Sequence, residues 1–111
     1  MFCTSALIPQ ADEAEYLARI FKALAHPNRL AIYLEVLRHQ ETALKSCGVS
    51  ELIDRLDIGA PTVSHHTKEL VQAGLIQVER DGKFLRCRIN PATQKLLADF
   101  FCMDQPASGI R

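Results

Sequence analysis

The sequence predicts a mainly α-helical domain that carries one β-hairpin. Apolar residues recur at helical spacing over most of the chain. A short turn at residues 57–60 separates two such stretches, and Asp81-Gly82 separates two stretches in which apolar and polar residues alternate. With 111 residues, 48% of them hydrophobic and 23% charged, we expect one globular domain.

The first two predicted helices supply most of the core. Apolar residues share one broad face over residues 11–25, and acidic residues fill the first turn, where they suit the helix dipole. Pro27 begins a second helix that runs to about His39. This helix is apolar on nearly all sides, which is typical of a buried helix. We expect residues 40–48 to form a polar connection.

Two short helices joined by a tight turn are predicted next. Ser50 is the expected N-cap of the first, which extends to about residue 56. Pro61 occupies the first position of the second helix, where its missing N–H costs nothing. Gly74 ends that helix as a left-handed cap.

A hairpin and a last helix complete the domain. Residues 75–80 and 83–89 predict two antiparallel strands, and Asn90-Pro91 begins a helix that runs to about Phe101. The resulting order, α-α-α-α-β-β-α, is that of a winged helix-turn-helix, in which the hairpin is the wing. We expect a loose arm at residues 1–10, the domain at 11–103 and a tail at 104–111.

The second helix of this motif, here called the recognition helix, can enter the major groove of DNA. Reading bases requires small hydrogen-bonding side chains near its N-terminus, and basic residues on the wing can contact phosphates. The expected contacts are Ala60, Pro61, Thr62, Ser64, His65, Lys68, Arg80 and Lys83. His66 is expected to be structural. The net charge of the chain is zero, and residues 60–90 contain five bases and three acids. This excess of two is modest, so binding independent of sequence should be weak and sensitive to salt.

Several of these motifs resemble the ArsR/SmtB family of transcriptional repressors. They are the run Gly59–His66, the run Ala73–Ile76 with the wing that follows it, and His26–Leu30, which is similar to the opening of the family's second helix. The resemblance covers about residues 14–101. It implies a sequence-specific DNA-binding repressor that loses its DNA when an effector binds.

The resemblance also implies a homodimer, because the family pairs two subunits through the first and last helices. Both predicted helices have wide apolar faces, although these faces could instead fill the core of one protomer. A two-fold protein reads an operator that is an imperfect inverted repeat in double-stranded DNA. The expected interface residues are Leu17, Phe21, Leu97 and Phe101.

The sequence departs from the family at its known sensing sites. The family's Cys-x-Cys pair is replaced by Gly48-Val49-Ser50, and no histidine follows His66, so the zinc site of the last helix is absent. Thr67 replaces a usually apolar residue, and we expect its hydroxyl to bond to the carbonyl of Val63.

Thiol chemistry remains as the expected signal. We expect reduced thiols, with Cys47, Cys102 and Cys3 converging, in part across the subunit boundary, on arsenite, antimonite or another soft metal ion. Lys45 and the following helix N-terminus are expected to lower the pKa of the Cys47 thiol. Cys87 is expected to face inward as a small apolar residue. The alternative is a repressor of the same fold that senses oxidants or reactive sulfur through one pair of thiols.

Other classes of protein are less well supported. No nucleophile, base and orienting group occur together and no glycine-rich phosphate loop is present, so we do not expect an enzyme. No apolar run could span a membrane and no secretory leader is recognisable, which favours a cytoplasmic protein. A winged helix can also serve as a protein–protein interaction module, but such a surface favours exposed aromatic residues, and residues 62–68 contain none.

Overall fold

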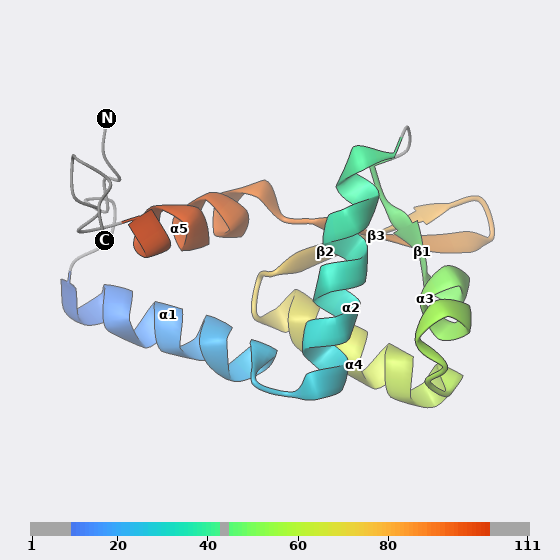
Figure 1. Ribbon diagram of the computed structural model, residues 1–111, viewed down its shortest axis with the longest axis horizontal. Coiled ribbons are helices and arrows are strands. Elements are labelled where there is room, and N and C mark those ends of the chain that lie inside the picture. Colours follow the sequence, from blue (N-terminus) through green and yellow to red (C-terminus); the bar gives the residue numbers. More distant parts are fainter. Residues whose placement is uncertain (1–9, 43–44, 103–111) are drawn as a thin grey trace, which may run out of the picture.

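The computed structural model describes residues 10–42 and 45–102. Figure 1 shows α2 at the centre and α4 running across it, with α3 and the wing on one side of α2 and α1 and α5 extending to the other. No helix in the described ranges is long and apolar enough to cross a membrane. The elements are α1 (Gln10–Leu24), α2 (Pro27–Arg38), the 3-10 helix η1 (His39–Glu41), β1 (Cys47–Gly48), α3 (Val49–Leu56), α4 (Ala60–Gln72), β2 (Ile76–Asp81), β3 (Phe84–Ile89) and α5 (Pro91–Cys102).

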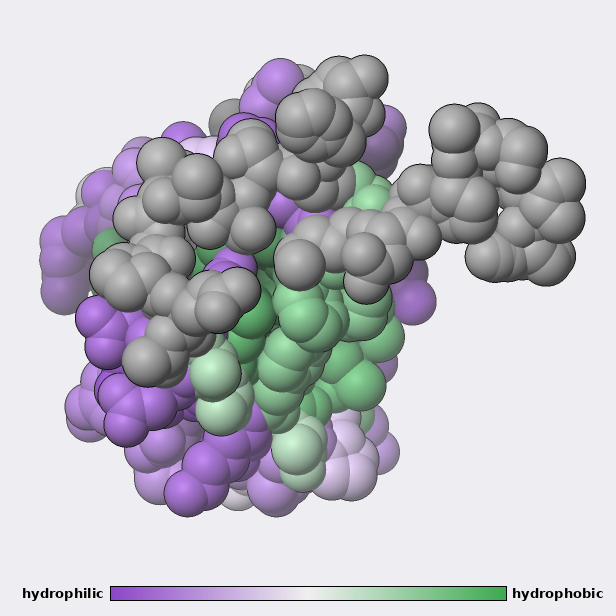
Figure 2. All heavy atoms as spheres, turned by 90° about the vertical axis from the view of Figure 1, so that its left-hand side faces the viewer, coloured by the Kyte–Doolittle hydropathy of each residue, from purple (hydrophilic) through white to green (hydrophobic). Residues whose placement is uncertain are grey.

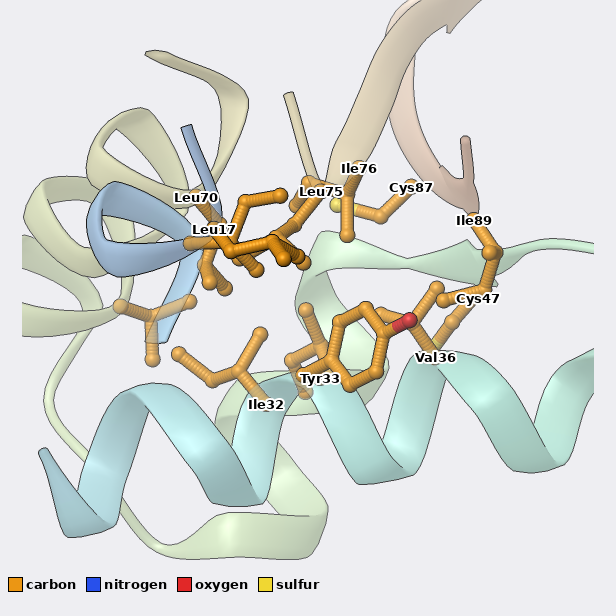
Figure 3. Close-up of a cluster of buried hydrophobic side chains, with 13 residues drawn as sticks. Leu17, Ile32, Tyr33, Val36, Cys47, Leu70, Leu75, Ile76, Cys87 and Ile89 are labelled. Atoms are coloured by element: carbon orange, nitrogen blue, oxygen red, sulfur yellow. The ribbon is translucent and has the colours of Figure 1, made fainter. Parts of the chain in front are cut away.

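The core lies between α2, α4 and the sheet. Ile32, Tyr33 and Val36 of α2 face this core (Figure 3). The expectation that α2 is buried on nearly all sides is wrong. Leu30 and Leu34 lie one turn apart on the same face of the helix, and each of them is about 40% exposed. The buried apolar side chains are Leu17, Ile20, Ile32, Tyr33, Val36, Cys47, Leu52, Val63, Leu70, Leu75, Ile76, Cys87 and Ile89.

The helix-turn-helix consists of α3 and α4. The cap of α3 is Gly48 rather than Ser50, because the Glu51 carboxylate accepts a hydrogen bond from the Gly48 amide at 2.9 Å. Asp57 ends α3 in the left-handed region, at φ 54°. Gly59 caps α4, which begins at Ala60, one residue before the predicted start.

The wing, which consists of β2 and β3, is joined by β1 in a three-stranded sheet of order β1-β3-β2. The Asp81-Gly82 hairpin is as predicted, with Gly82 at φ 67°. β1 was not predicted, since residues 40–48 were expected to form only a connection. Cys47 in β1 lies opposite Cys87 in β3, and the Arg86 guanidinium beside them donates to the Ser46 hydroxyl at 2.7 Å and to its carbonyl at 3.0 Å.

α5 is joined to the end of α4 through one backbone carbonyl. Gly74 follows α4 at φ 79°, which confirms the predicted left-handed cap. Its carbonyl accepts hydrogen bonds from the Asn90 side-chain amide, at 2.9 Å, and from the hydroxyl of the buried Thr93. The last helix is therefore held in register with the recognition helix.

α1 and α5 lie side by side at one end of the molecule (Figure 1). The Phe21 ring lies 5.6 Å from that of Phe100 and 6.0 Å from that of Phe101, between centroids. Figure 2 views this end and shows apolar side chains gathered between hydrophilic flanks. The predicted arm and tail fall almost wholly outside the described residues.

Candidate nucleic-acid interface and thiol sites

The outer face of α4 is polar and the inner face is packed. Ser64, His65 and Lys68 are exposed, whereas Val63 and Leu70 are fully buried. All eight predicted contacts are exposed on α4 or the wing, as a surface that reads DNA requires. They are Ala60, Pro61, Thr62, Ser64, His65, Lys68, Arg80 and Lys83.

Two polar residues of α4 serve the fold. The Thr67 hydroxyl donates to the Val63 carbonyl at 2.6 Å, as predicted from the sequence. His66 is buried, and its ring centroid lies 4.4 Å from that of His26. The His26 ring accepts a hydrogen bond from the Asn28 amide and so caps α2, which places α4 against the start of that helix.

The bases of the wing divide into two groups. The Arg86 guanidinium donates a hydrogen bond to the Ser46 hydroxyl, and Arg88 forms an ion pair with Glu79. Arg80 and Lys83 are exposed and form no ion pair within residues 10–42 and 45–102. These two cations, with Lys68 on α4, are available to DNA phosphates.

The structure does not bring the three predicted sensing thiols together in one protomer. Cys47 lies in β1 beside the wing, whereas Cys102 ends α5 at the opposite end of the molecule (Figure 1). Cys3 lies outside the described residues. The expectation of reduced thiols holds for Cys47 and Cys87, which are free, but not for Cys102, which is exposed and disulfide-bonded.

The environment of Cys47 also differs from the prediction. Burial, reinforced by Glu51 and Cys87, raises the pKa of the Cys47 thiol to about 12. Lys45 is exposed and does not offset these effects. Cys87 is fully buried, as expected, and burial raises its pKa to about 11. Neither thiol is a reactive surface nucleophile.

The sequence analysis missed the neighbours of Cys47. His39 and Glu51 each place a possible ligand atom near the Cys47 Sγ, and the three atoms lie within 4.8 Å of one another. Glu51 had a detectable signal, since a glutamate in the first turn of a helix often accepts a capping bond. No feature of the sequence pointed to His39, because only the packing of α2 brings this residue close to Cys47.

Cys47, Cys102 and Cys3 were the three cysteines predicted to carry the signal, but the cysteines among the described residues do not fit an ion held by three thiolates. Cys47 and Cys87 supply two adjacent sulfurs, and Cys102 is distant and already bonded. A site with one sulfur, one imidazole and one carboxylate instead fits an ion of borderline softness, such as zinc.

The fold and the exposed polar helix define a winged helix-turn-helix regulator. The chain matches a family model described as a helix-turn-helix domain over residues 24–79. It is 39% identical over 69 residues to a probable mercury resistance operon repressor of Streptomyces lividans, covering 62% of this chain and 50% of that protein. It is 33% identical over 81 residues to the transcriptional repressor SmtB of Mycobacterium tuberculosis, covering 73% of this chain and 56% of that protein.

A solved structure gives the same picture of the fold. It is the homodimeric winged helix-turn-helix DNA-binding domain of a possible ArsR-family regulator from Mycobacterium bovis. The TM-score is 0.66 at 23% identity, covering 87% of this chain and 86% of that one. The chain belongs to the ArsR/SmtB family of transcriptional regulators. It spans about half the length of the two curated relatives. The matched family and the curated relatives are transcriptional regulators, which confirms the expectation from the sequence that the protein is not an enzyme.

Proposed function

We propose that the protein is a transcriptional repressor that binds an inverted-repeat operator as a homodimer. The observation that carries this proposal is the division of α4 into a packed inner face and a polar outer face. The exposed hydroxyl of Ser64 and imidazole of His65 can read base edges, while Arg80 and Lys83 contact the backbone beside them.

The apolar end formed by α1 and α5 supports pairing of two protomers. Phe101 is 68% exposed and Phe100 is 37% exposed, which is costly for large aromatic side chains on a free surface. Phe21, which contacts both rings, and Leu97 are partly buried and pack against the core. Leu17 is removed from the predicted interface, because it is only 7% exposed within the core of its own chain.

The proposed signal is a thiol-binding metal or metalloid ion. One relative is named as a probable mercury resistance repressor, and this chain carries a buried thiol at the start of its helix-turn-helix. An ion bound there would act on the geometry of α3 and α4, which must fit the groove. Coupling of 1–3 kcal/mol would be enough to release DNA.

The test is fluorescence anisotropy with the duplex upstream of the protein's own coding region. We expect tighter binding than to a scrambled duplex. Among zinc, mercury(II), arsenite and antimonite, each added separately, the effector is the ion that lowers the affinity by about 5- to 150-fold. Equal affinity for the two duplexes would reject sequence-specific repression and favour a protein–protein module.

A redox signal is the second candidate, and the disulfide bond of Cys102 favours it. Under this alternative, diamide and dithiothreitol would shift operator affinity in opposite directions without any metal. The shift would disappear in Cys102→Ser. If neither reagent changes the affinity while a metal ion does, the redox alternative is rejected.

A further inference from the structure

Three side chains from separate elements converge where β1 meets α3. His39 follows the last turn of α2, Cys47 lies in β1 and Glu51 lies in the first turn of α3. Their ligand atoms, one imidazole nitrogen, the thiol sulfur and one carboxylate oxygen, lie within 4.8 Å of one another. Cys47 is fully buried against α2 (Figure 3), whereas the Glu51 side chain is 47% exposed. The cluster therefore has a closed inner wall and an opening to solvent.

The His39 ring is held as it is in many metal sites. Its Nδ1 lies 2.9 Å from the Glu35 carbonyl, and because a carbonyl can only accept, Nδ1 must carry the proton. In the neutral ring the free lone pair is then on Nε2, which lies 3.8 Å from the Glu51 carboxylate. Histidines that bind metals commonly donate their other N–H to a carbonyl or a carboxylate. The ring is 12% exposed, so this orientation is fixed by packing.

Glu51 can use one oxygen for the fold and the other for a ligand. Its Oε1 accepts the capping bond from the Gly48 amide at 2.9 Å. Its Oε2 is the oxygen that faces His39. The capping bond thus fixes the carboxylate without consuming it. The buried Glu35 carboxylate lies 3.8 Å from the Nδ1 side of the His39 ring and is paired with Arg38, at 2.8 Å, and Arg55, at 3.4 Å.

We propose that His39, Cys47 and Glu51 bind one divalent ion of the zinc class. A thiolate, a neutral imidazole and a carboxylate supply two negative charges and three donors, and water can take the fourth position of a tetrahedral ion. Bond lengths of about 2.0–2.3 Å require the three side chains to move inward by short distances. The ion would link the end of α2 to the start of the helix-turn-helix.

The direct test is a titration of the reduced full chain with Co(II), whose absorption reports thiolate ligation and tetrahedral geometry. We expect one equivalent to bind, with a thiolate-to-cobalt charge-transfer band that zinc abolishes by displacement. Cys47→Ser should remove the band, and His39→Ala should weaken binding at least tenfold. Cys87→Ser is the matched control, because it removes the neighbouring buried sulfur and should keep the band.

Glu51→Gln keeps the inference testable if the buried variants fail to fold. Its amide oxygen can still accept the capping bond, so the fold should persist while cobalt affinity falls at least tenfold. No charge-transfer band in the wild-type protein would overturn the inference. So would a band that survives in Cys47→Ser, or one that is lost to the same extent in Cys87→Ser.

Binding of the ion does not rest on the proposed function, but its effect on DNA does. The cobalt titration contains no DNA, so it can succeed even if repression is rejected. A protein that binds its operator but shows no cobalt band would keep the proposed repression, and it would lose both this site and the proposed ion signal at Cys47.

Discussion

His66 is a buried, titratable residue within the recognition helix. It is 6% exposed, and its Nδ1 has no hydrogen-bond partner among the described residues. Burial lowers the pKa of the His66 imidazole, and the nearby His26 and Arg29 lower it further, while Glu69 acts in the opposite direction. The neutral ring can pack against His26, whereas a protonated ring would be a buried cation near Arg29, and the attraction of Glu69 does not compensate for its burial.

Acidification should therefore destabilise the protein through His66. The unfolded chain takes up this proton near pH 6.5, whereas the folded chain takes it up only at a lower pH. The free energy of unfolding should fall as the pH drops below about 6.5. Urea denaturation measured from neutral pH to about pH 5 checks this prediction. His66→Phe, which cannot titrate, should have a flatter profile, and an unchanged profile would remove His66 as the cause.

Contacts with bases and with phosphates should separate in the anisotropy assay. His65→Ala should cost about 1–3 kcal/mol on the operator and little on scrambled DNA, because it removes the proposed base contact. Lys83→Ala should weaken binding to both duplexes and flatten the dependence on salt, because it removes the proposed phosphate contact. Equal losses on both duplexes for His65→Ala would contradict its assigned role.

At the scale of elements, local chemistry determined what could be predicted. The Asp81-Gly82 hairpin and the Gly74 cap depend on a few adjacent residues, and both were predicted correctly. The prediction of Ser50 as the N-cap of α3 was wrong because Gly48 and Ser50 compete for this position. The hydrogen bond from the Gly48 amide to the Glu51 carboxylate decides in favour of Gly48. β1 was missed because a two-residue strand exists only through pairing with β3, far along the chain.

The same distinction applies to the candidate sites. The outward face of α4 follows from helical periodicity, so its exposed residues could be predicted from sequence. The environment of Cys47 depends on contacts with distant segments. A lysine two residues away suggested a lowered pKa, but packing against β3 buries the thiol and raises it. His39 reaches the same place only through the direction of α2.

The bond between α5 and the end of α4 gives a prediction about stability. Thr93→Val removes the buried hydroxyl that donates to the Gly74 carbonyl and keeps the shape of the side chain. The free energy of unfolding should fall by about 0.5–1.5 kcal/mol, measured by urea denaturation. Thr42→Val is the control, because its hydroxyl donates to the His39 carbonyl and accepts from the Lys45 amide, and water can replace both of these exposed bonds. A loss no larger than that of the control would show that the buried bond adds little.

At the scale of the whole molecule, the apolar end and the DNA-reading surface are separate. α1 and α5 form one end, whereas the N-terminal part of α4 and the wing lie toward the other (Figure 1). A protomer paired through its apolar end would therefore present its recognition helix away from the two-fold axis. Two such helices can enter successive major grooves, which are about 34 Å apart on one face of DNA.

Phe101→Glu tests this arrangement directly. A charge on a ring that is 68% exposed should not unfold the protomer, but it should prevent two apolar ends from associating. We expect the variant to sediment as a monomer and to bind the inverted repeat no better than a single half-site. Phe84→Glu is the matched control, since this phenylalanine is 63% exposed at the wing and lies away from α1 and α5, so the dimer should persist. A dimeric Phe101→Glu, or a wild-type monomer that binds a lone half-site as tightly as the full repeat, would show that the α1–α5 face does not assemble the repressor.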